Sequence, residues 1–153
     1  MVNVFAVYDT KYGNTRTVAE SIVEGLGETE GVDITIVDIE NIDINNIPEF
    51  DVLLIGSPNH IGGPVRGITR FIDRLGKLGL TGKKAAVFDT YMGGDVNKAV
   101  QKMEKRIKNR APGLSLITSG LSVRVDTAKG PIAEDDMPKC WAYGETIAKL
   151  ITS

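Results

Sequence analysis

Residues 8–15, which read YDTKYGNT, combine hydroxyl side chains, an amide side chain and one glycine in a single short stretch. They follow an apolar run of strand length and precede a helical pattern, so their backbone N–H groups lie at the start of a helix. Such groups lack partners inside the helix, and the helix dipole there favours negative charge. Thr10, Asn14 and Thr15 add donors, and Gly13 lets a ligand approach the backbone closely. The stretch predicts an anion site, but a helix capped by Asn14 or Thr15 explains it equally well on these residues alone.

Two later segments have a similar character. Residues 57–63 (SPNHIGG) and residues 90–95 (TYMGGD) are rich in glycine, hydroxyl groups or aromatic rings, and each follows an apolar run. In open parallel sheets, ligands bind beyond the carboxyl ends of the strands, where the strand order reverses. We therefore expect the three segments to share one site.

The elements that must position these segments follow from hydrophobic periodicity. The expected strands are residues 2–7, 32–38, 51–56, 84–89 and 114–118. The expected helices are residues 18–26, 64–75, 96–107 and 137–151, with Pro64 in the first turn of the second and Asp95 as the cap of the third. Residues 39–50 show no sustained period, and residues 121–125 alternate and either prolong or flank the fifth strand.

The alternation of strands and helices predicts right-handed crossovers and a parallel sheet with helices on both faces. Residues 51–56 (DVLLIG) are the most apolar strand and are expected at the centre of the sheet. Residues 32–38 alternate between apolar and polar side chains, which favours an edge strand with one wetter face.

The composition is typical of one ordinary globular domain. The chain has 153 residues, of which 42% are hydrophobic and 25% are charged. No apolar run is long enough to span a membrane, and the first residues lack the basic start of a signal peptide. We therefore expect a cytoplasmic location and partners that include neither membrane nor nucleic acid. The single cysteine, Cys140, excludes an internal disulfide and fits a small buried side chain of the last helix.

The net charge of −2 conceals an asymmetry along the chain. Residues 1–51 hold eleven acidic side chains and two basic ones, whereas residues 52–153 hold nine acidic and sixteen basic ones. The two faces of the molecule are therefore expected to differ in sign. The favoured explanation of this asymmetry is that the charged side chains lie on solvated helix surfaces. The more specific alternative is electrostatic steering of a partner toward one side of the molecule.

The sequence lacks the common motifs of nucleotide-binding proteins and of hydrolases. Gly25, Gly27 and Gly31 follow a helix and are one residue out of register for a dinucleotide loop. Residues 82–84 carry a lysine where a phosphate-binding loop needs a hydroxyl. The chain has one histidine and no Gly-x-Ser-x-Gly sequence. A phosphoryl-receiver domain would need a carboxylate after the third strand, where the sequence is Gly-Ser-Pro.

Taken together, the three segments resemble the loops of the flavodoxin family, and especially those of the flavodoxin-like domain of flavodiiron proteins. YDTKYGNT is similar to the loop that holds the FMN phosphate, GSPNHIGGP to one flavin-ring loop, and FDTYMGGD to the other. The resemblance covers essentially the whole chain. It implies an α/β fold of three layers, with a five-stranded parallel sheet of order 2-1-3-4-5 and helices on both faces. It also implies a single FMN-binding domain over residues 1–153.

The same resemblance implies which residues bind FMN. The backbone N–H groups of residues 11–15 and two threonine hydroxyls would hold the phosphate, without need of the cations Lys11 and Arg16. The flavin ring would lie among Pro58, Asn59, His60, Tyr91 and Met92. The complete implied set is Thr10, Lys11, Tyr12, Gly13, Asn14, Thr15, Ser57, Pro58, Asn59, His60, Gly62, Thr90, Tyr91, Met92, Gly93, Gly94 and Asp95. No catalytic residue and no metal is implied.

The chain departs from the family pattern around the flavin ring. His60 stands where many flavodoxins have a tryptophan, although a solvent-exposed loop histidine is the alternative explanation. The tyrosine that often follows Gly-Asp in the second ring loop is missing, and Tyr91 is the candidate to replace it. In the family, a peptide of the first ring loop turns toward flavin N5 and stabilises the one-electron-reduced flavin. Ile61 occupies that position, and a β-branched residue resists positive φ, so either poor stabilisation or a movement at Gly62 or Gly63 is expected.

Three functions remain open at this point. The resemblance implies a small FMN-dependent electron carrier that works between redox partner proteins. The alternative is an FMN-dependent reductase of quinones or similar acceptors, which takes hydride from NAD(P)H. A binding module without flavin is the third and least favoured.

Overall fold

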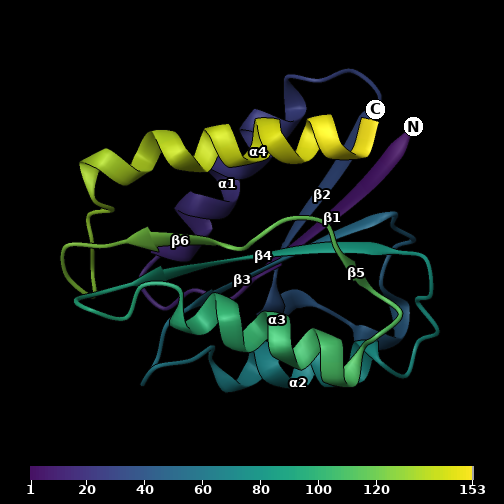
Figure 1. Ribbon diagram of the computed structural model, residues 1–153, viewed down its shortest axis with the longest axis horizontal. Helices are drawn as coiled ribbons and strands as arrows, with labels where there is room; N and C mark the ends of the chain where they lie inside the picture. The colour runs from purple at the N-terminus through teal and green to yellow at the C-terminus, as the bar shows by residue number, and fades with distance from the viewer. Residues whose placement is uncertain (153) are drawn as a thin grey trace.

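The computed structural model describes residues 1–152, so Ser153 of the expected domain lies outside the described residues (Figure 1). Within them the strands are β1 (Val2–Tyr8), β2 (Val32–Asp38), β3 (Val52–Pro58), β4 (Lys84–Tyr91), β5 (Ser115–Leu116) and β6 (Leu121–Arg124). The helices are α1 (Asn14–Gly27), α2 (Arg66–Leu75), α3 (Lys98–Arg110) and α4 (Met137–Thr152). Short 3-10 turns lie in the connections: η1 (Ile39–Asn41), η2 (Ile44–Asn46) and η3 (Glu134–Asp136).

The strands form one sheet of order β2-β1-β3-β4-β5, and every strand pair is parallel. The predicted order 2-1-3-4-5 is confirmed, with the apolar β3 at the centre and the alternating β2 at an edge. Val7 pairs with Ile55, and Ile55 pairs with Val87. This register brings the carboxyl ends of β1, β3 and β4 together at one edge of the sheet.

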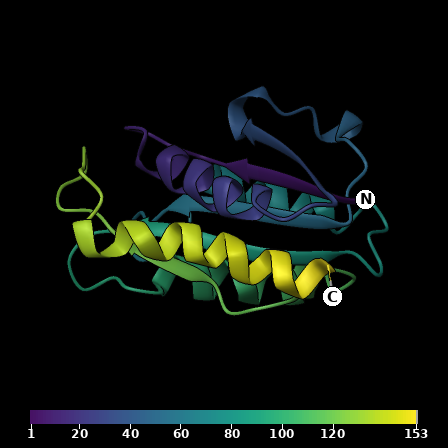
Figure 2. The ribbon, with the colours of Figure 1, turned by 90° about the horizontal axis from the view of Figure 1, so that it is seen from above.

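Helices cover both faces of the sheet, as predicted (Figure 1). Because successive strand residues point to opposite faces, the strands contribute to two separate cores. Helices α1 and α4 pack on one face, over side chains that include Val4, Leu54 and Phe88. Helices α2 and α3 pack on the other face, over side chains that include Phe5 and Leu53. Figure 2 shows α1 and α4 side by side above the sheet.

The fifth strand differs from its prediction, because it is broken into two short pieces along the same edge of β4. β5 pairs with the start of β4 and β6 with its end. Between the two pieces, the backbone groups turn toward side chains of the helices. The N–H of Gly120 donates to the Glu104 carboxylate at 3.2 Å, and the carbonyl of Ser119 accepts from the Tyr143 hydroxyl at 2.9 Å. Residues 121–125 were expected either to prolong or to flank the fifth strand, and residues 121–124 form a separate strand, β6, that pairs with the end of β4.

Two helix starts were predicted wrongly. Pro64 is not in the first turn of α2, because it pairs with Asn59 in an antiparallel bridge and Val65 is still extended, with φ −68° and ψ 155°. Asp95 does not cap α3, which begins at Lys98 after Asn97 in a left-handed conformation. Both differences lengthen the loops at the carboxyl edge of the sheet.

Cys140 is fully buried in α4, as predicted, and burial raises the pKa of its thiol to about 11. Among residues 1–152, no helix combines the length and the apolar character that crossing a membrane requires.

Candidate functional site

A cavity of about 400 Å³ lies at the carboxyl ends of β1, β3 and β4, which is within the size range of small-molecule sites. It is lined by Thr10, Lys11, Tyr12, Asn14, Thr15, Pro58, Asn59, His60, Ile61, Val65, Thr90, Tyr91, Met92, Asp95, Val125 and Ala128. Twelve of the seventeen residues expected at the site are among them. The three loops singled out in the sequence therefore meet at one cavity.

The other five expected residues do not line the cavity: Gly13, Ser57, Gly62, Gly93 and Gly94. Ser57 is fully buried behind it, where its hydroxyl oxygen accepts the N–H of Val65 at 3.0 Å and holds the loop that precedes α2. Gly62 and Gly93 occupy turns with φ of 74° and 63°. These residues shape the loops and contribute no wall of the cavity.

One end of the cavity is formed by the start of α1. Gly13 is the N-cap residue, with φ 94°, and its N–H donates to the Thr10 hydroxyl at 2.9 Å. The N–H groups of Asn14, Thr15 and Arg16 find no acceptor within residues 1–152. Free N–H groups at a helix start, with hydroxyl groups beside them, suit an anion.

The alternative explanation of this segment as a helix cap is wrong. Gly13 holds the N-cap position, and no side chain caps α1. Asn14 instead donates from Nδ2 to the carbonyl of Ala128 at 3.1 Å. The hydroxyls of Thr15 and Thr90 lie 3.0 Å apart, and both residues are buried. Asn14 and Thr15 thus join the first loop to two others.

A buried acceptor without a partner marks the opposite part of the cavity. Asn59 donates from Nδ2 to the Asp95 carboxylate at 2.8 Å, which fixes the direction of its amide. Its Oδ1 is buried and has no hydrogen-bond partner in the described chain. Leaving such a group unsatisfied costs about 1–3 kcal/mol. Hydrogen bonds from Lys98 and then Asn59 lower the pKa of Asp95, which keeps this carboxylate charged. The arrangement suits a ligand with an N–H donor.

The loop between β3 and α2 is a tight hairpin. His60 and Gly63 exchange two backbone hydrogen bonds, of 2.7 and 3.2 Å. The two residues between them, Ile61 and Gly62, have φ of 50° and 74°, as a type I′ turn requires. Ile61 therefore adopts the positive φ that its β-branched side chain resists, at a cost of about 1–2 kcal/mol. Ile61 adopts this conformation because the two hydrogen bonds between His60 and Gly63 fix both turn residues.

The five side chains expected around a ring all line the cavity, at different depths. Tyr91, Pro58 and Asn59 are half-buried, whereas His60 and Met92 are exposed at the rim. His60 is thus a solvent-exposed loop residue, as the alternative explanation expects, and its side chain also lines the cavity, where packing on a flavin ring stays a prediction.

Two lysines lie beside the ring of Tyr12 near the start of α1. The Nζ atoms of Lys11 and Lys129 are 5.4 and 6.0 Å from the ring centroid. Arg16 forms an exposed ion pair with Glu20 at 3.5 Å and is not among the residues that line the cavity. Lys11 and Arg16 were both expected to be unnecessary for phosphate binding, and of the two only Lys11 lines the cavity.

Sequence reasoning missed a fourth wall of the cavity, which contains Val125 and Ala128. This segment follows β6, and the N–H of Val125 donates to the carbonyl of Tyr91 at 2.9 Å. The alternation of residues 121–125 carried the signal, because the end of any strand of this sheet reaches the same edge. Ile61 and Val65 were also missed as cavity residues.

Comparison with known proteins connects this geometry with a family. A family model described as flavodoxin matches residues 7–135. A flavodoxin of Synechocystis sp. is 33% identical over 89 residues, which are 58% of this chain and 51% of that protein. The type A flavoprotein fprA of Rhodobacter capsulatus is 28% identical over 149 residues, which are 95% of this chain and 32% of that protein. The matches thus span about half of the flavodoxin and about a third of the type A flavoprotein.

Solved structures show the same fold. An archaeal flavodoxin superposes with a TM-score of 0.80 at 20% identity and covers 99% of both chains. The flavodiiron protein of Giardia intestinalis has a TM-score of 0.80 at 17% identity, over 97% of this chain and 36% of that one. The family model accounts for most of the residues that form the sheet and the cavity. The chain therefore belongs to the flavodoxin family, whose members bind FMN.

Proposed function

We propose that this chain is an electron-transfer protein that binds one FMN in the cavity and exchanges electrons with redox partner proteins. The observation that carries the proposal is the chemical contrast between the two parts of the cavity. One part offers free N–H groups at the start of α1, and the other offers the unpartnered Oδ1 of Asn59. A flavin mononucleotide carries a phosphate at one end and an N–H flanked by carbonyls at the other.

The residues at each part would have distinct tasks. The N–H groups of Asn14, Thr15 and Arg16 would hold the phosphate through charge-assisted hydrogen bonds. Asn59 would accept the N–H of the ring, and Tyr91 and His60 would pack beside it. FMN supplies the redox chemistry, and the protein sets its potential through burial, hydrogen bonds and nearby charge. In this proposal the whole chain forms a single FMN-binding unit.

The conformation of Ile61 supports one-electron chemistry. The sequence predicts poor stabilisation of the one-electron-reduced flavin if the peptide movement needs positive φ at Ile61, or else a movement at Gly62 or Gly63. Ile61 already has φ 50°, and Gly62 follows it with φ 74°. The positive φ that the carrier hypothesis needs at this loop is therefore accessible to Ile61, which supports the carrier over the two-electron reductase.

One observation favours the reductase as a second candidate. His60 and Met92 are exposed at the rim of the cavity, so one side of the ring position is open to a second substrate. A hydride donor such as NAD(P)H needs that access. The two functions therefore differ in how the bound flavin is reduced and not in how it is held.

Anaerobic stepwise reduction of the FMN-loaded protein separates the two functions. For the carrier, a long-wavelength absorbance band should rise to the midpoint of the titration and then disappear, and NAD(P)H alone should leave the flavin oxidised. Direct bleaching without such a band, together with turnover of NAD(P)H and a quinone, would establish the reductase instead. A protein that emerges colourless from dialysis after FMN is added would be the binding module.

A further inference from the structure

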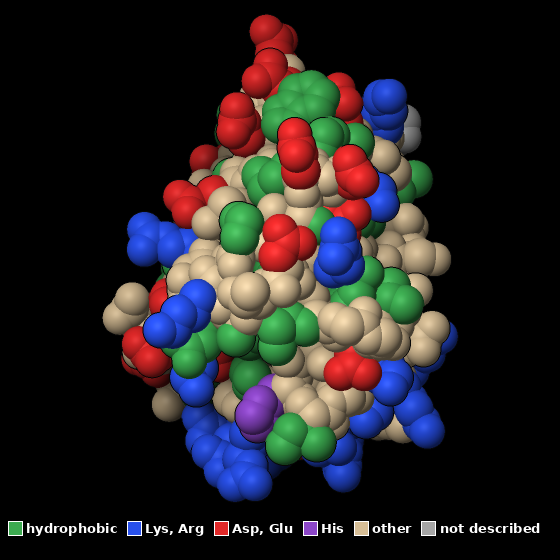
Figure 3. Space-filling model, turned by 90° about the vertical axis from the view of Figure 1, so that its left-hand side faces the viewer, with side chains coloured by type: hydrophobic (Ala, Val, Ile, Leu, Met, Phe, Trp, Pro, Cys, Tyr) green, Lys and Arg blue, Asp and Glu red, His purple; other side chains and the backbone are tan. Residues whose placement is uncertain are grey.

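The two helical layers of the molecule differ strongly in charge. Helices α2 and α3 carry nine basic side chains and two acidic ones, Asp73 and Glu104. Helices α1 and α4 carry three of each sign. On the face where the strands end, Lys and Arg side chains gather at the lower side and Asp and Glu at the upper side (Figure 3). The basic layer therefore reaches the face that holds the cavity.

Three lysines of α3 bring this charge to the edge of the cavity. Lys98, Lys102 and Lys105 line a shallow groove together with Gly62 and Gln101. Gly62 of the hairpin lines the groove, and its neighbours His60 and Ile61 line the cavity, so the two hollows adjoin the same hairpin. The Nζ atom of Lys98 forms an ion pair with the Asp95 carboxylate at 3.0 Å. Within residues 1–152, Lys102 and Lys105 form no ion pair.

An apolar patch lies next to these lysines. Ile61, at the tip of the hairpin, is 89% exposed, and Met92 and Val96 in the facing loop are 46% and 49% exposed. The hydrogen bonds between His60 and Gly63 hold Ile61 in its strained conformation, with its large apolar side chain in solvent. An apolar centre beside a charged rim is the usual anatomy of a protein interface.

We propose that this surface docks a redox protein whose own cofactor is ringed by Asp and Glu side chains. The proposal rests on the proposed function, because it names the chemistry of the partner at the same site. Ile61 and Met92 would contact the partner directly beside the cavity, and Lys102 and Lys105 would meet its carboxylates. Complementary charge steers such encounters and raises their rate about 10- to 1,000-fold at low salt.

The groove fits a protein better than a phosphate-bearing dinucleotide. Lys98 and Lys105 are seven residues apart, so their positions on α3 are separated by about 10 Å along the helix axis. A phosphate site needs donors that converge on one point, whereas these cations are spread along an open surface. A row of carboxylates on a protein matches that spacing.

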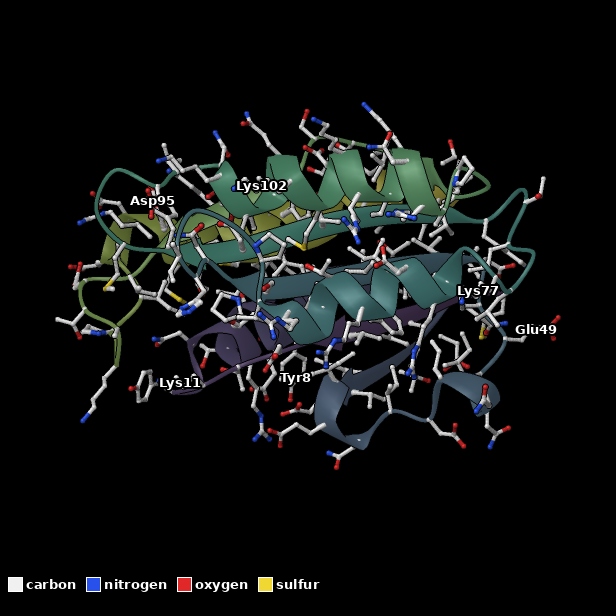
Figure 4. The ribbon with its side chains drawn as sticks, turned by 90° about the horizontal axis from the view of Figure 1, so that it is seen from below. Tyr8, Lys11, Glu49, Lys77, Asp95 and Lys102 are labelled. Atoms are coloured by element: carbon white, nitrogen blue, oxygen red, sulfur yellow. The ribbon has the colours of Figure 1, made fainter. Side chains whose placement is uncertain are left out.

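Two double variants test the surface. Lys102→Glu with Lys105→Glu reverses the charge at the groove. Lys77→Glu with Lys84→Glu makes the same change in net charge at two exposed lysines away from the cavity. Figure 4 shows Lys77 at the opposite end of the basic layer from Lys102 and Asp95. Any difference between the double variants therefore reports position and not total charge.

The kinetic probe is hexacyanoferrate(III), a small anion that accepts one electron from the reduced flavin as its iron passes from Fe(III) to Fe(II). In the natural protein, oxidation should slow at least tenfold between about 0.01 and about 1 M salt, as the screening length falls from about 30 to about 3 Å. The groove variant should lose this dependence, whereas the control variant should keep it. If both double variants lose the salt dependence to the same extent, or if neither loses it, the proposal is wrong.

A second readout needs no cofactor. Hexacyanochromate(III) is a redox-inert paramagnetic anion that broadens the NMR signals of the surface it visits. The signals of residues 98–105 and of the hairpin should broaden more than those near Lys77 and Lys84, with or without FMN. Uniform broadening would contradict the docking surface even if FMN binding is confirmed. Specific shifts of the lysine signals with NADP⁺ would identify a dinucleotide site and likewise overturn the proposal.

Discussion

Asp89 is a buried carboxylate directly behind the cavity. It accepts the N–H of Val100 at 3.0 Å and the hydroxyl of Ser122 at 2.6 Å, and it has no exposed surface. The N-cap residue of α3 makes no side-chain hydrogen bond to the helix. The carboxylate of Asp89, on β4, instead accepts a backbone N–H of the first turn of α3. It joins β4, α3 and β6 next to Thr90 and Tyr91, which line the cavity. Burial raises its pKa to about 6, against the opposing effect of these hydrogen bonds.

This pKa predicts a specific dependence of stability on pH. The unfolded carboxyl has its ordinary pKa of 3.8 and the folded one a pKa of about 6, so the unfolded state loses its proton first as pH rises. The contribution of Asp89 to the free energy of unfolding should therefore fall between about pH 4 and pH 6, by about 3 kcal/mol. It should then stay constant at higher pH.

Urea unfolding of the FMN-free protein and of Asp89→Asn across this pH range measures the effect. Subtracting the two curves removes the other titrating groups, and the difference in favour of the natural protein should shrink as pH rises. A difference that is constant or grows with pH would mean that Asp89 is ionised in the folded protein throughout.

At the scale of single residues, types and order along the chain predicted much of the site. Thr10, Asn59 and Tyr91 line the cavity because each follows a strand that the apolar pattern identifies. The partners of these residues were beyond prediction, since they depend on pairs far apart in sequence. The bond between Asn59 and Asp95 spans 36 positions, and that between Asp89 and Ser122 spans 33.

At the scale of elements, α1 is held in place by close contact with α4. Gly25 of α1 lies against the carbonyl of Trp141, and Gly144 of α4 lies against the carbonyl of Ile22. A Cβ atom at either glycine would overlap the opposing backbone. The two helices therefore approach at glycine positions, and this contact sets where the start of α1 meets the cavity.

Gly144→Ala should separate the two helices. The added methyl group meets rigid backbone, so we expect a loss of about 1–3 kcal/mol in the free energy of unfolding, together with weaker FMN binding as α1 shifts. Gly27→Ala is the matched control, because its Cβ would meet nothing within 4 Å. Urea unfolding and flavin fluorescence measure both effects. If the two variants are equally stable and bind FMN equally, the helix contact does not position the site.

The helices and strands themselves were largely predictable, because each buries a periodic apolar stripe or run. The errors lie where chain connections override local pattern. Pro64 suits a helix start, yet its pairing with Asn59 keeps the chain extended past it. Residues 114–118 read as one strand, but side chains of α3 and α4 draw the backbone away at Ser119 and Gly120. Neither contact can be predicted from the pattern of the neighbouring residues.

At the scale of the whole molecule, the charge asymmetry of the sequence becomes a difference between layers. Nine basic side chains of α2 and α3 form one outer layer, and their most direct ion pair with an acidic side chain joins Arg106 to Asp73 at 2.6 Å. The sequence predicted two regions of opposite sign. It did not predict that the basic layer borders the cavity, because the groove joins α3 to Gly62 of the hairpin, which is far away in the sequence.

The central proposal is that the cavity recognises FMN through both its phosphate and its ring. Titration of the FMN-free protein with FMN and with riboflavin, which lacks the phosphate, tests this most directly. Each charge-assisted hydrogen bond contributes about 1.5–3 kcal/mol, so losing two should weaken riboflavin binding roughly 100-fold or more. Quenching of flavin fluorescence should thus show one tight FMN site per chain and a far weaker riboflavin site. Equal affinities, or no quenching by either flavin, would contradict the proposal.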